Sequence, residues 1–219
     1  ENCSFQIDTD WKLGFTGRNG RGKTTLLRLL QGEYEYTGSI QSSVSFGYFP
    51  CPVPDPEQLT ADVLEEIAPE AAQWQFLREF AQLELSPDLL WQPFRTLSGG
   101  EQTKILLAAL FLREGCFPLI DEPTNHLDYG NQLRALSMVR ALVKRGFGVI
   151  MTSHNPDHVL LLGGQVGILG NDGRFLVGNA EEVMTEERLR ALYRSDLYLT
   201  YVERVGRKVC IPGRLKSDE

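Results

Sequence analysis

Apolar residues recur along the chain with two different spacings, and together these spacings predict alternating strands and helices. Short apolar or alternating runs, typical of strands, cover residues 4–8, 11–16, 38–50, 116–120 and 147–153. Apolar residues three and four positions apart, typical of helices, occur within residues 24–31, 97–115 and 132–146. Since parallel strands need crossover helices, we expect an α/β fold with a mostly parallel, doubly wound sheet and flanking helices.

Composition changes after residue 49, where four prolines fall within residues 50–58. A segment this rich in proline is a loop or hinge. Helical spacing then covers residues 60–90, so we expect a helical subdomain over about 51–99, inserted into an α/β core of residues 1–50 and 100–219. Further on, we expect a hairpin over residues 165–178 and two short helices over 180–184 and 186–193. Helix stops are expected at Gly32, Gly115 and Gly146.

Length and composition indicate one globular domain. The chain has 219 residues, and its longest apolar run, residues 105–112, is too short to cross a bilayer. The chain begins with Glu1, consistent with a trimmed start, and no signal segment opens it. Its net charge of −7 argues against broad electrostatic binding to nucleic acid or anionic membrane, although not against a local basic patch. Four cysteines without metal-type spacing predict free thiols in a reducing compartment, with an incidental disulfide as the less favoured alternative.

The segment GRNGRGKT, residues 17–24, lies between a predicted strand and a predicted helix. Its glycines let backbone N–H groups converge on phosphate oxygens, and the following helix directs its positive end towards them. In this pattern Lys23 is expected to reach the β- and γ-phosphates and Thr24 to bind Mg²⁺. The alternative is a glycine-rich turn that contains Lys-Thr by chance, which the flanking strand and helix disfavour.

Two adjacent acids, Asp121 and Glu122, follow the strand over residues 116–120. A buried carboxylate is costly without a cationic partner, and a Mg²⁺ ion held by Asp121 would offset that cost. Glu122 suits the orientation or deprotonation of an attacking water, with an N-cap or surface acid as the alternative. His154 follows another strand, at the edge where α/β sheets bind ligands, so it could bond the γ-phosphate or be a structural histidine. We assign no chemistry to His126, expected in a loop, or to His158, expected on a helix surface.

The segment LSGGEQ, residues 97–102, follows GRNGRGKTT and precedes LIDEPT, HLD and SH. With these five motifs in this order, nearly the whole chain resembles an ATP-binding-cassette (ABC) ATPase, a P-loop NTPase that binds ATP and Mg²⁺. The resemblance implies catalytic roles for Lys23, Glu122 and His154 and metal ligands in Thr24 and Asp121. It implies nucleotide contacts from Gly17, Asn19, Gly20, Gly22, Lys23, Thr24, Thr25, Ser98, Gly99, Gly100, Glu101 and Asp128.

In that family the signature of one cassette closes over ATP held by another, so we expect a head-to-tail dimer with two composite sites. The start of the helix after Ser98 agrees with this, because it offers a second anion-binding helix end. Two departures stand out. Cys51 occupies the position of the family's usual glutamine, for which Gln58 is a displaced substitute. No residue matches the adenine-stacking aromatic, since Phe5 and Trp11 are expected in the core.

Within the family, the two halves of the chain resemble different branches. The first half resembles antibiotic-resistance ABC-F proteins, which act on ribosomes. The second half resembles the ATPase subunits of iron-siderophore, vitamin B12 and metal-chelate importers. The change falls near Asp128, which favours a join of two relatives over a natural divergent cassette.

Two roles follow from these resemblances. An importer ATPase would work in the cytoplasm, at the inner face of the cell membrane, beneath a membrane permease. An ABC-F protein would bind the ribosome, but such proteins carry two cassettes, and a net charge of −7 offers little to ribosomal RNA. The importer role is favoured. A third reading, a nucleotide-dependent clamp without hydrolysis, is disfavoured by Glu122.

Overall fold

A computed structural model describes residues 5–18, 20–125, 127–170 and 175–213. Its main sheet has the strand order β2-β3-β4-β1-β5-β6, and only β6 runs antiparallel to its neighbour. The strands are β1 (Lys12–Thr16), β2 (Ser45–Phe49), β3 (Cys116–Ile120), β4 (Val149–Ser153), β5 (Gln165–Leu169) and β6 (Phe175–Asn179). The predicted α/β fold with a mostly parallel sheet is therefore confirmed.

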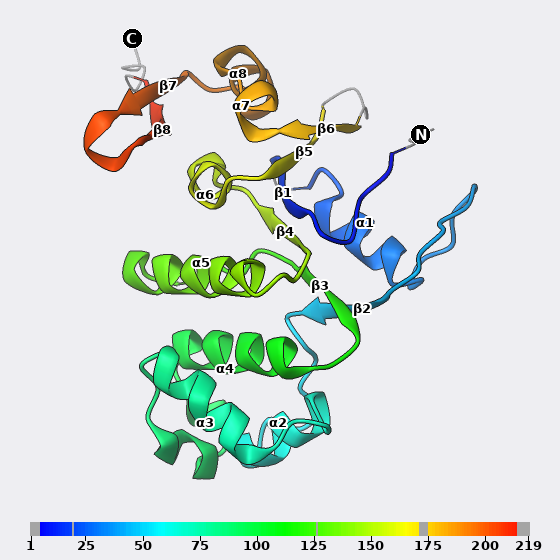
Figure 1. The fold of residues 1–219 in the computed structure, drawn as a ribbon, viewed down its shortest axis with the longest axis vertical. Coiled ribbons are helices and arrows are strands. Elements are labelled where there is room, and N and C mark those ends of the chain that lie inside the picture. Colours follow the sequence, from blue (N-terminus) through cyan, green and yellow to red (C-terminus); the bar gives the residue numbers. More distant parts are fainter. Residues whose placement is uncertain (1–4, 19, 126, 171–174, 214–219) are drawn as a thin grey trace.

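Helices cover both faces of this sheet (Figure 1), with α1 (Lys23–Leu30) on one side and α5 (Tyr129–Lys144) and α6 (Pro156–Leu162) on the other. The alternation of side chains along β1 explains the arrangement. Leu13 packs with Leu27 of α1. Gly14 faces α6, where an added Cβ would lie 2.7 Å from Val159 Cγ1, so glycine permits the close approach of this helix.

The helices predicted over residues 60–90 are present as α2 (Thr60–Ile67), α3 (Gln73–Gln82) and the 3₁₀ helix η1 (Pro87–Trp91), followed by η2 (Phe94–Thr96). α2 and α3 pack on α4 (Gly99–Leu112), η1 packs on α2 and α3, and Figure 1 shows these helices together at one end of the molecule. Every residue of α4 from Lys104 onwards is buried. A helix that is apolar all round needs cover on every side, and α2 and α3 supply it together with β2 and α5.

Glycines end two of the predicted helices as expected. After α1, Gly32 has φ +77° and its N–H bonds the Leu29 carbonyl, while the Glu33 N–H bonds the Arg28 carbonyl. These two bonds form a Schellman motif, which needs a left-handed residue where glycine avoids the Cβ penalty. Gly146, with φ +91°, ends α5 in the same way, since its N–H bonds the Val143 carbonyl and the Phe147 N–H bonds the Leu142 carbonyl. The stop expected at Gly115 is displaced, because α4 ends at Leu112 with an extended C-cap at Arg113, and Gly115, with φ +67°, lies in the turn that follows.

The expected strand over residues 4–8 is wrong for the described residues, because Phe5 to Asp8 have no regular structure. The turn that follows is present, with the Trp11 N–H bonded to the Asp8 carbonyl at 3.1 Å. Phe5 is 37% exposed and contacts Phe175 with tilted rings, 4.4 Å between ring centroids, so it is a surface residue rather than the expected core residue.

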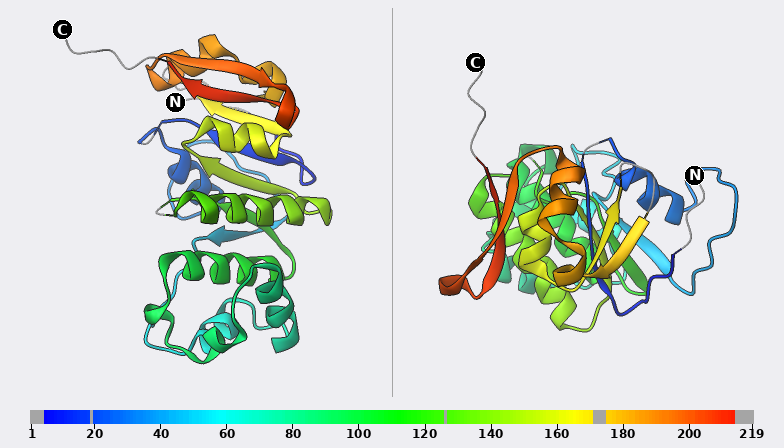
Figure 2. Two further views of the ribbon diagram at one scale, coloured as in Figure 1. Left: turned by 90° about the vertical axis from the view of Figure 1, so that its left-hand side faces the viewer. Right: turned by 90° about the horizontal axis from the view of Figure 1, so that it is seen from above.

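The C-terminal part contains the expected hairpin β5–β6 and the expected helices α7 (Ala180–Val183) and α8 (Glu186–Tyr193). It also contains a hairpin that was not predicted, β7 (Leu197–Val202) with β8 (Arg207–Pro212). Figure 2 shows this hairpin beside α7 and α8, at the end of the molecule opposite α2 and α3. Within the described residues, no helix combines the length and apolar character needed to cross a membrane.

Candidate active site

The glycine-rich segment forms the loop between the end of β1 and the start of α1. Gly20 and Gly22 have φ +75° and +88°, a conformation that glycine adopts at no steric cost. An added Cβ on Gly20 would meet nothing within 4 Å, so the loop faces open space there. Thr24 and Thr25 are exposed in the first turn of α1, where free N–H groups and the helix dipole favour an anion. Asn19 lies outside the described residues.

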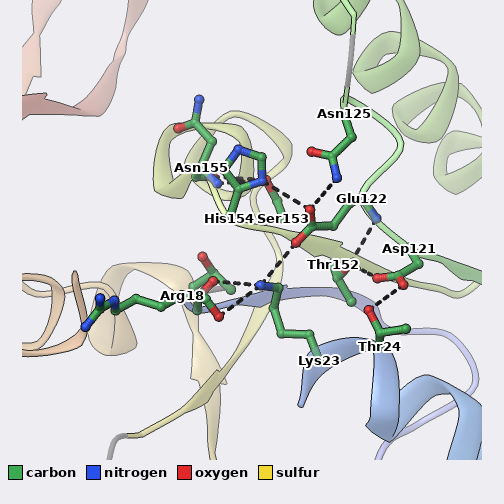
Figure 3. A network of polar contacts seen from close by, with 12 residues as sticks. Arg18, Lys23, Thr24, Asp121, Glu122, Asn125, Thr152, Ser153, His154 and Asn155 are labelled. Atoms are coloured by element: carbon green, nitrogen blue, oxygen red, sulfur yellow. Dashed lines mark hydrogen bonds and ion pairs between the residues drawn. The ribbon is translucent and has the colours of Figure 1, made fainter. Parts of the chain in front are cut away.

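The Lys23 ammonium lies at the centre of this loop and is only 3% exposed. It donates hydrogen bonds to the carbonyls of Gly17 at 2.8 Å and Arg18 at 3.3 Å. It also forms an ion pair with Glu122 Oε1 at 3.1 Å (Figure 3). Burial of an ammonium group is costly without such partners, so these contacts fix the position of the charge.

Asp121 directly follows β3, and its carboxylate accepts hydrogen bonds from three hydroxyl groups. Thr24 Oγ1 donates to Oδ2 at 2.7 Å and Tyr48 OH donates to the same oxygen at 2.9 Å. Thr152 Oγ1 donates to Oδ1, as Figure 3 also shows. Burial and the hydrogen bond to Asp121 raise the pKa of Tyr48 to about 12, so its hydroxyl stays a neutral donor. Thr24 and Asp121 thus present adjacent oxygen atoms, the ligand type that Mg²⁺ prefers.

Glu122 has a left-handed backbone, with φ +46°, and its N–H donates to Thr152 Oγ1 at 2.9 Å. Left-handed non-glycine residues carry strain and cluster at functional sites. Besides Lys23, the carboxylate accepts from Asn125 Nδ2 at 2.6 Å and contacts His154 Nδ1 at 3.3 Å. Burial raises the pKa of this carboxyl, but hydrogen bonds from Lys23 and Asn125 and the nearby charges outweigh it and lower the pKa overall. Glu122 is therefore ionised at neutral pH.

Two histidines follow β4, and they differ in exposure. The His154 side chain is 45% exposed and reaches Glu122. His158, in α6, was expected on a helix surface, and that expectation is wrong, because this residue is only 6% exposed. Its Nδ1 lies 3.4 Å from Thr124 Oγ1 and 3.5 Å from Ser153 Oγ, between the segments that carry Glu122 and His154. Burial lowers the pKa of His158, which keeps the ring neutral. His126 lies outside the described residues.

The LSGGEQ segment forms the start of α4 away from the glycine-rich loop. Ser98 is the N-cap, and a capping box joins it to Glu101, with Ser98 Oγ 2.7 Å from Glu101 Oε2. Asp128 caps the start of α5 by accepting from the Asn131 N–H at 2.9 Å. An added Cβ on Gly100 would lie 3.1 Å from Asn131 Nδ2, so the two helix starts are close neighbours.

The glycine-rich loop and Glu122 enclose a hollow of about 300 Å³. Its lining residues are Gly20, Gly22, Lys23, Thr24, Thr25 and Glu122, and residues 98–101 are not among them. The volume lies at the low end of the roughly 300–1,000 Å³ typical of small-molecule sites. The surface of the hollow suits a phosphate chain more than a whole nucleotide.

Neither the Cys51 thiol nor the Gln58 amide takes the position of the family's glutamine. Cys51 is 7% exposed and its Sγ donates to the Tyr48 carbonyl at 3.3 Å, while burial raises its pKa to about 11. Gln58 donates through Nε2 to Glu66 at 3.1 Å. The side chains that reach Asp121 and Glu122 instead include Tyr48, Asn125 and Thr152, which sequence reasoning missed. Their common signal is a position in or just after strands that end at the same sheet edge.

Three comparisons place the chain among known proteins. Residues 1–125 match the family model described as ABC transporter. An uncharacterized ABC transporter ATP-binding protein of Haemophilus influenzae is 32% identical over 119 residues, which are 54% of this chain and 45% of that protein. The chain thus spans less than half of that relative.

Other relatives match over more of the chain. The hemin import ATP-binding protein HmuV of Rhizobium etli is 26% identical, with 87% of this chain and 83% of that protein covered. The human ATP-binding cassette sub-family F member 3 is 29% identical, with 73% of this chain and 23% of that protein covered. A solved ABC transporter described as of metal-chelate type, in an inward-facing conformation, superimposes with a TM-score of 0.81 at 25% identity, with 96% of this chain and 90% of that chain covered.

The family match, the solved structure and the polar network at one sheet edge agree with one another. The chain belongs to the ABC transporter family, as an ATP-binding cassette with ATPase chemistry.

Proposed function

We propose that the residues around Lys23 and Glu122 catalyse the attack of water on the γ-phosphate of ATP. The observation that carries this proposal is the contact set at one sheet edge. The buried Lys23 ammonium pairs with the Glu122 carboxylate, and the Thr24 hydroxyl bonds the Asp121 carboxylate. Thr152 Oγ1 links the two acids, because it accepts from the Glu122 N–H and donates to Asp121. Lys23 would neutralise charge on the phosphates, and the ionised Glu122 would orient and deprotonate the water. His154, which already reaches Glu122, would hold the γ-phosphate.

Mg²⁺ fits the oxygen atoms of Thr24 and Asp121, which are 2.7 Å apart. When bound, the ion would neutralise the charge that develops on the phosphates. Tyr48 and Thr152 would orient the Asp121 carboxylate through their hydroxyl groups. Gly17, Asn19, Gly20, Gly22 and Thr25 would complete the phosphate cradle of this same loop.

We propose that the chain acts as a head-to-tail dimer of single cassettes. Residues 98–101 do not line the hollow at Lys23. Ser98 and Gly99 are instead exposed at the start of α4. A partner's helix start, with Gly100 and Glu101 behind it, could therefore close over the phosphates. Asp128 would face the same junction.

In this proposal residues 1–50 and 100–219 form the α/β core, and residues 51–99 form the helical subdomain.

For the biological role, we propose the energy-coupling subunit of an importer of metal chelates. The matches to HmuV and to the metal-chelate type transporter both extend over more than 85% of this chain. As such a subunit the chain would work in the cytoplasm, bound to the inner face of a membrane permease. An ABC-F role at the ribosome is the second candidate, supported by the match to the human sub-family F protein.

Two measurements separate these roles. Uptake of labelled hemin, cobalamin and ferric siderophore is compared in cells that carry the parent chain or Glu122→Gln, and the importer role predicts that the variant abolishes uptake of one of them. Purified protein is also sedimented with ribosomes and ATP. ATP-dependent co-sedimentation together with unchanged uptake would contradict the importer role and support the ribosomal one.

A further inference from the structure

A tyrosine from the C-terminal helices reaches the root of the glycine-rich loop. Tyr193, the last residue of α8, places its hydroxyl 2.8 Å from Thr16 Oγ1, across 177 positions of sequence. Thr16 is fully buried. Leu189 and Leu192 of α8 belong to one apolar cluster with Val166 and Ile168 of the sheet. The hydrogen bond thus adds a directional contact to this apolar packing.

The position of Thr16 links this bond to the phosphate loop. Thr16 ends β1 and directly precedes Gly17, whose carbonyl accepts the hydrogen bond from Lys23. In the sheet Thr16 lies between Ser153 of β4 and Ile168 of β5, and Ser153 directly precedes His154. A shift of Thr16 would therefore move the backbone that holds the Lys23 ammonium.

The Tyr193 side chain is partly buried against the same apolar cluster. Arg194, with φ +51°, ends α8 in a left-handed turn. Arg190 Nε donates to the Leu197 carbonyl at 2.7 Å and so fixes the chain that leaves this turn. Burial raises the pKa of Tyr193 to about 12, so its hydroxyl is neutral at any physiological pH. The hydroxyl therefore stays a neutral hydrogen-bond partner of Thr16.

We propose that Tyr193 is a positioning residue for ATP binding, because its hydroxyl fixes Thr16 and thereby the loop that carries Lys23. The C-terminal helix α8 then contributes to nucleotide affinity without touching the nucleotide. This inference rests on the proposed assignment of the loop to ATP.

The test compares Tyr193→Phe with Tyr198→Phe, a matched control whose hydroxyl is on an exposed ring and bonds Asp196 at 3.2 Å. Affinity is measured with a fluorescent ATP analogue and Mg²⁺, next to KM, kcat and the melting temperature. Loss of one partly buried hydrogen bond predicts affinity about fivefold weaker and a rise in KM with kcat little changed. The melting temperature should fall by only about 2–4 °C in a chain of this size.

Three further variants make the test independent of ring packing. Thr16→Val should weaken binding as much as Tyr193→Phe, Thr16→Ser should retain the parent affinity, and the double variant Thr16→Val/Tyr193→Phe should be no weaker than either single variant. Parent-like affinity in Tyr193→Phe, or independent losses that multiply in the double variant, would overturn the inference. If the parent protein itself binds no ATP, the proposed function fails instead, so the two failures are distinguishable.

Discussion

Replacement of Glu122 by glutamine probes the network where its charge matters most. The side chain is 15% exposed and lies 3.1 Å from the Lys23 ammonium. At that distance and an effective dielectric constant of about 20, the Coulomb attraction is about 5 kcal/mol before desolvation is subtracted. Lys23 keeps two carbonyl acceptors in the variant, and glutamine keeps an acceptor oxygen. We therefore expect the free energy of unfolding to fall by only about 2–3 kcal/mol.

The effect on turnover should be larger than the effect on stability. General base catalysis contributes roughly 10²–10⁴ in rate, so Glu122→Gln should lower kcat about 10³-fold, or about 4 kcal/mol in the activation barrier. ATP binding should persist because Lys23 and the glycine-rich loop remain. With ATP bound and not hydrolysed, the variant should accumulate as a dimer.

The assays are phosphate release, titration with a fluorescent ATP analogue, and light scattering after size-exclusion chromatography. Glu33→Gln is the matched control, because it makes the same chemical change in an exposed ion pair with Arg28 at 3.8 Å. The control should hydrolyse ATP at the parent rate. Parent-rate turnover in Glu122→Gln would refute the role assigned to this carboxylate.

Three further predictions address other parts of the site. Lys23→Ala should weaken ATP analogue binding at least tenfold, since a buried charge that meets the phosphates is lost, and unchanged affinity in the titration would contradict the loop assignment. Tyr48→Phe removes one of two hydroxyl groups that bond Asp121 Oδ2, so the Mg²⁺ concentration for half-maximal turnover should change by about threefold or more. A Mg²⁺ titration like that of the parent would show that the Tyr48 hydroxyl does not affect metal binding. His158 has a pKa lowered by burial, with Asp157 opposing and His154 reinforcing the shift. Because the unfolded chain then binds a proton that the folded chain does not, the free energy of unfolding should fall as pH drops below about 6.5, and His158→Gln should flatten this slope in denaturant titrations from pH 7.5 to 5.5.

The sequence predicted the parts of the fold that depend on local signals. Apolar spacing located the sheet strands and long helices, although the strand expected over residues 38–50 is confined to Ser45–Phe49. Gly32 and Gly146 marked helix stops that the positive φ angles confirm, whereas α4 ends at Leu112, before Gly115. Sequence reasoning missed the hairpin β7–β8, although residues 197–202 alternate and Gly206 marks the turn. This two-stranded sheet has few buried residues, and its attachment depends on a contact distant in sequence, the pair between Arg207 and Asp157 of α6 at 2.7 Å.

For the site, motif spacing found Lys23, Thr24, Asp121 and Glu122, and the structure brings these four together. It did not find Tyr48, Thr152 or Tyr193, because these three residues lie outside the recognised motifs and reach the site only through tertiary contacts. The burial of His158 was missed for a similar reason, since α6 is too short for its spacing to show which face it buries.

The join near Asp128 stays a prediction. The core runs across that point without interruption, because Ile120 before it and Leu136 after it belong to the same apolar cluster. Sequencing of the gene across codon 128 tests the join directly.

The most direct test of the central claim is calorimetric titration of the purified chain with ATP, with and without Mg²⁺, followed by determination of the molecular mass of the Glu122→Gln variant. The account predicts Mg²⁺-dependent binding that Asp121→Ala abolishes, and a dimer of the Glu122→Gln chain with one ATP bound per cassette. ATP binding that depends on neither Mg²⁺ nor Asp121 would contradict it, and so would a Glu122→Gln chain that stays monomeric with ATP bound.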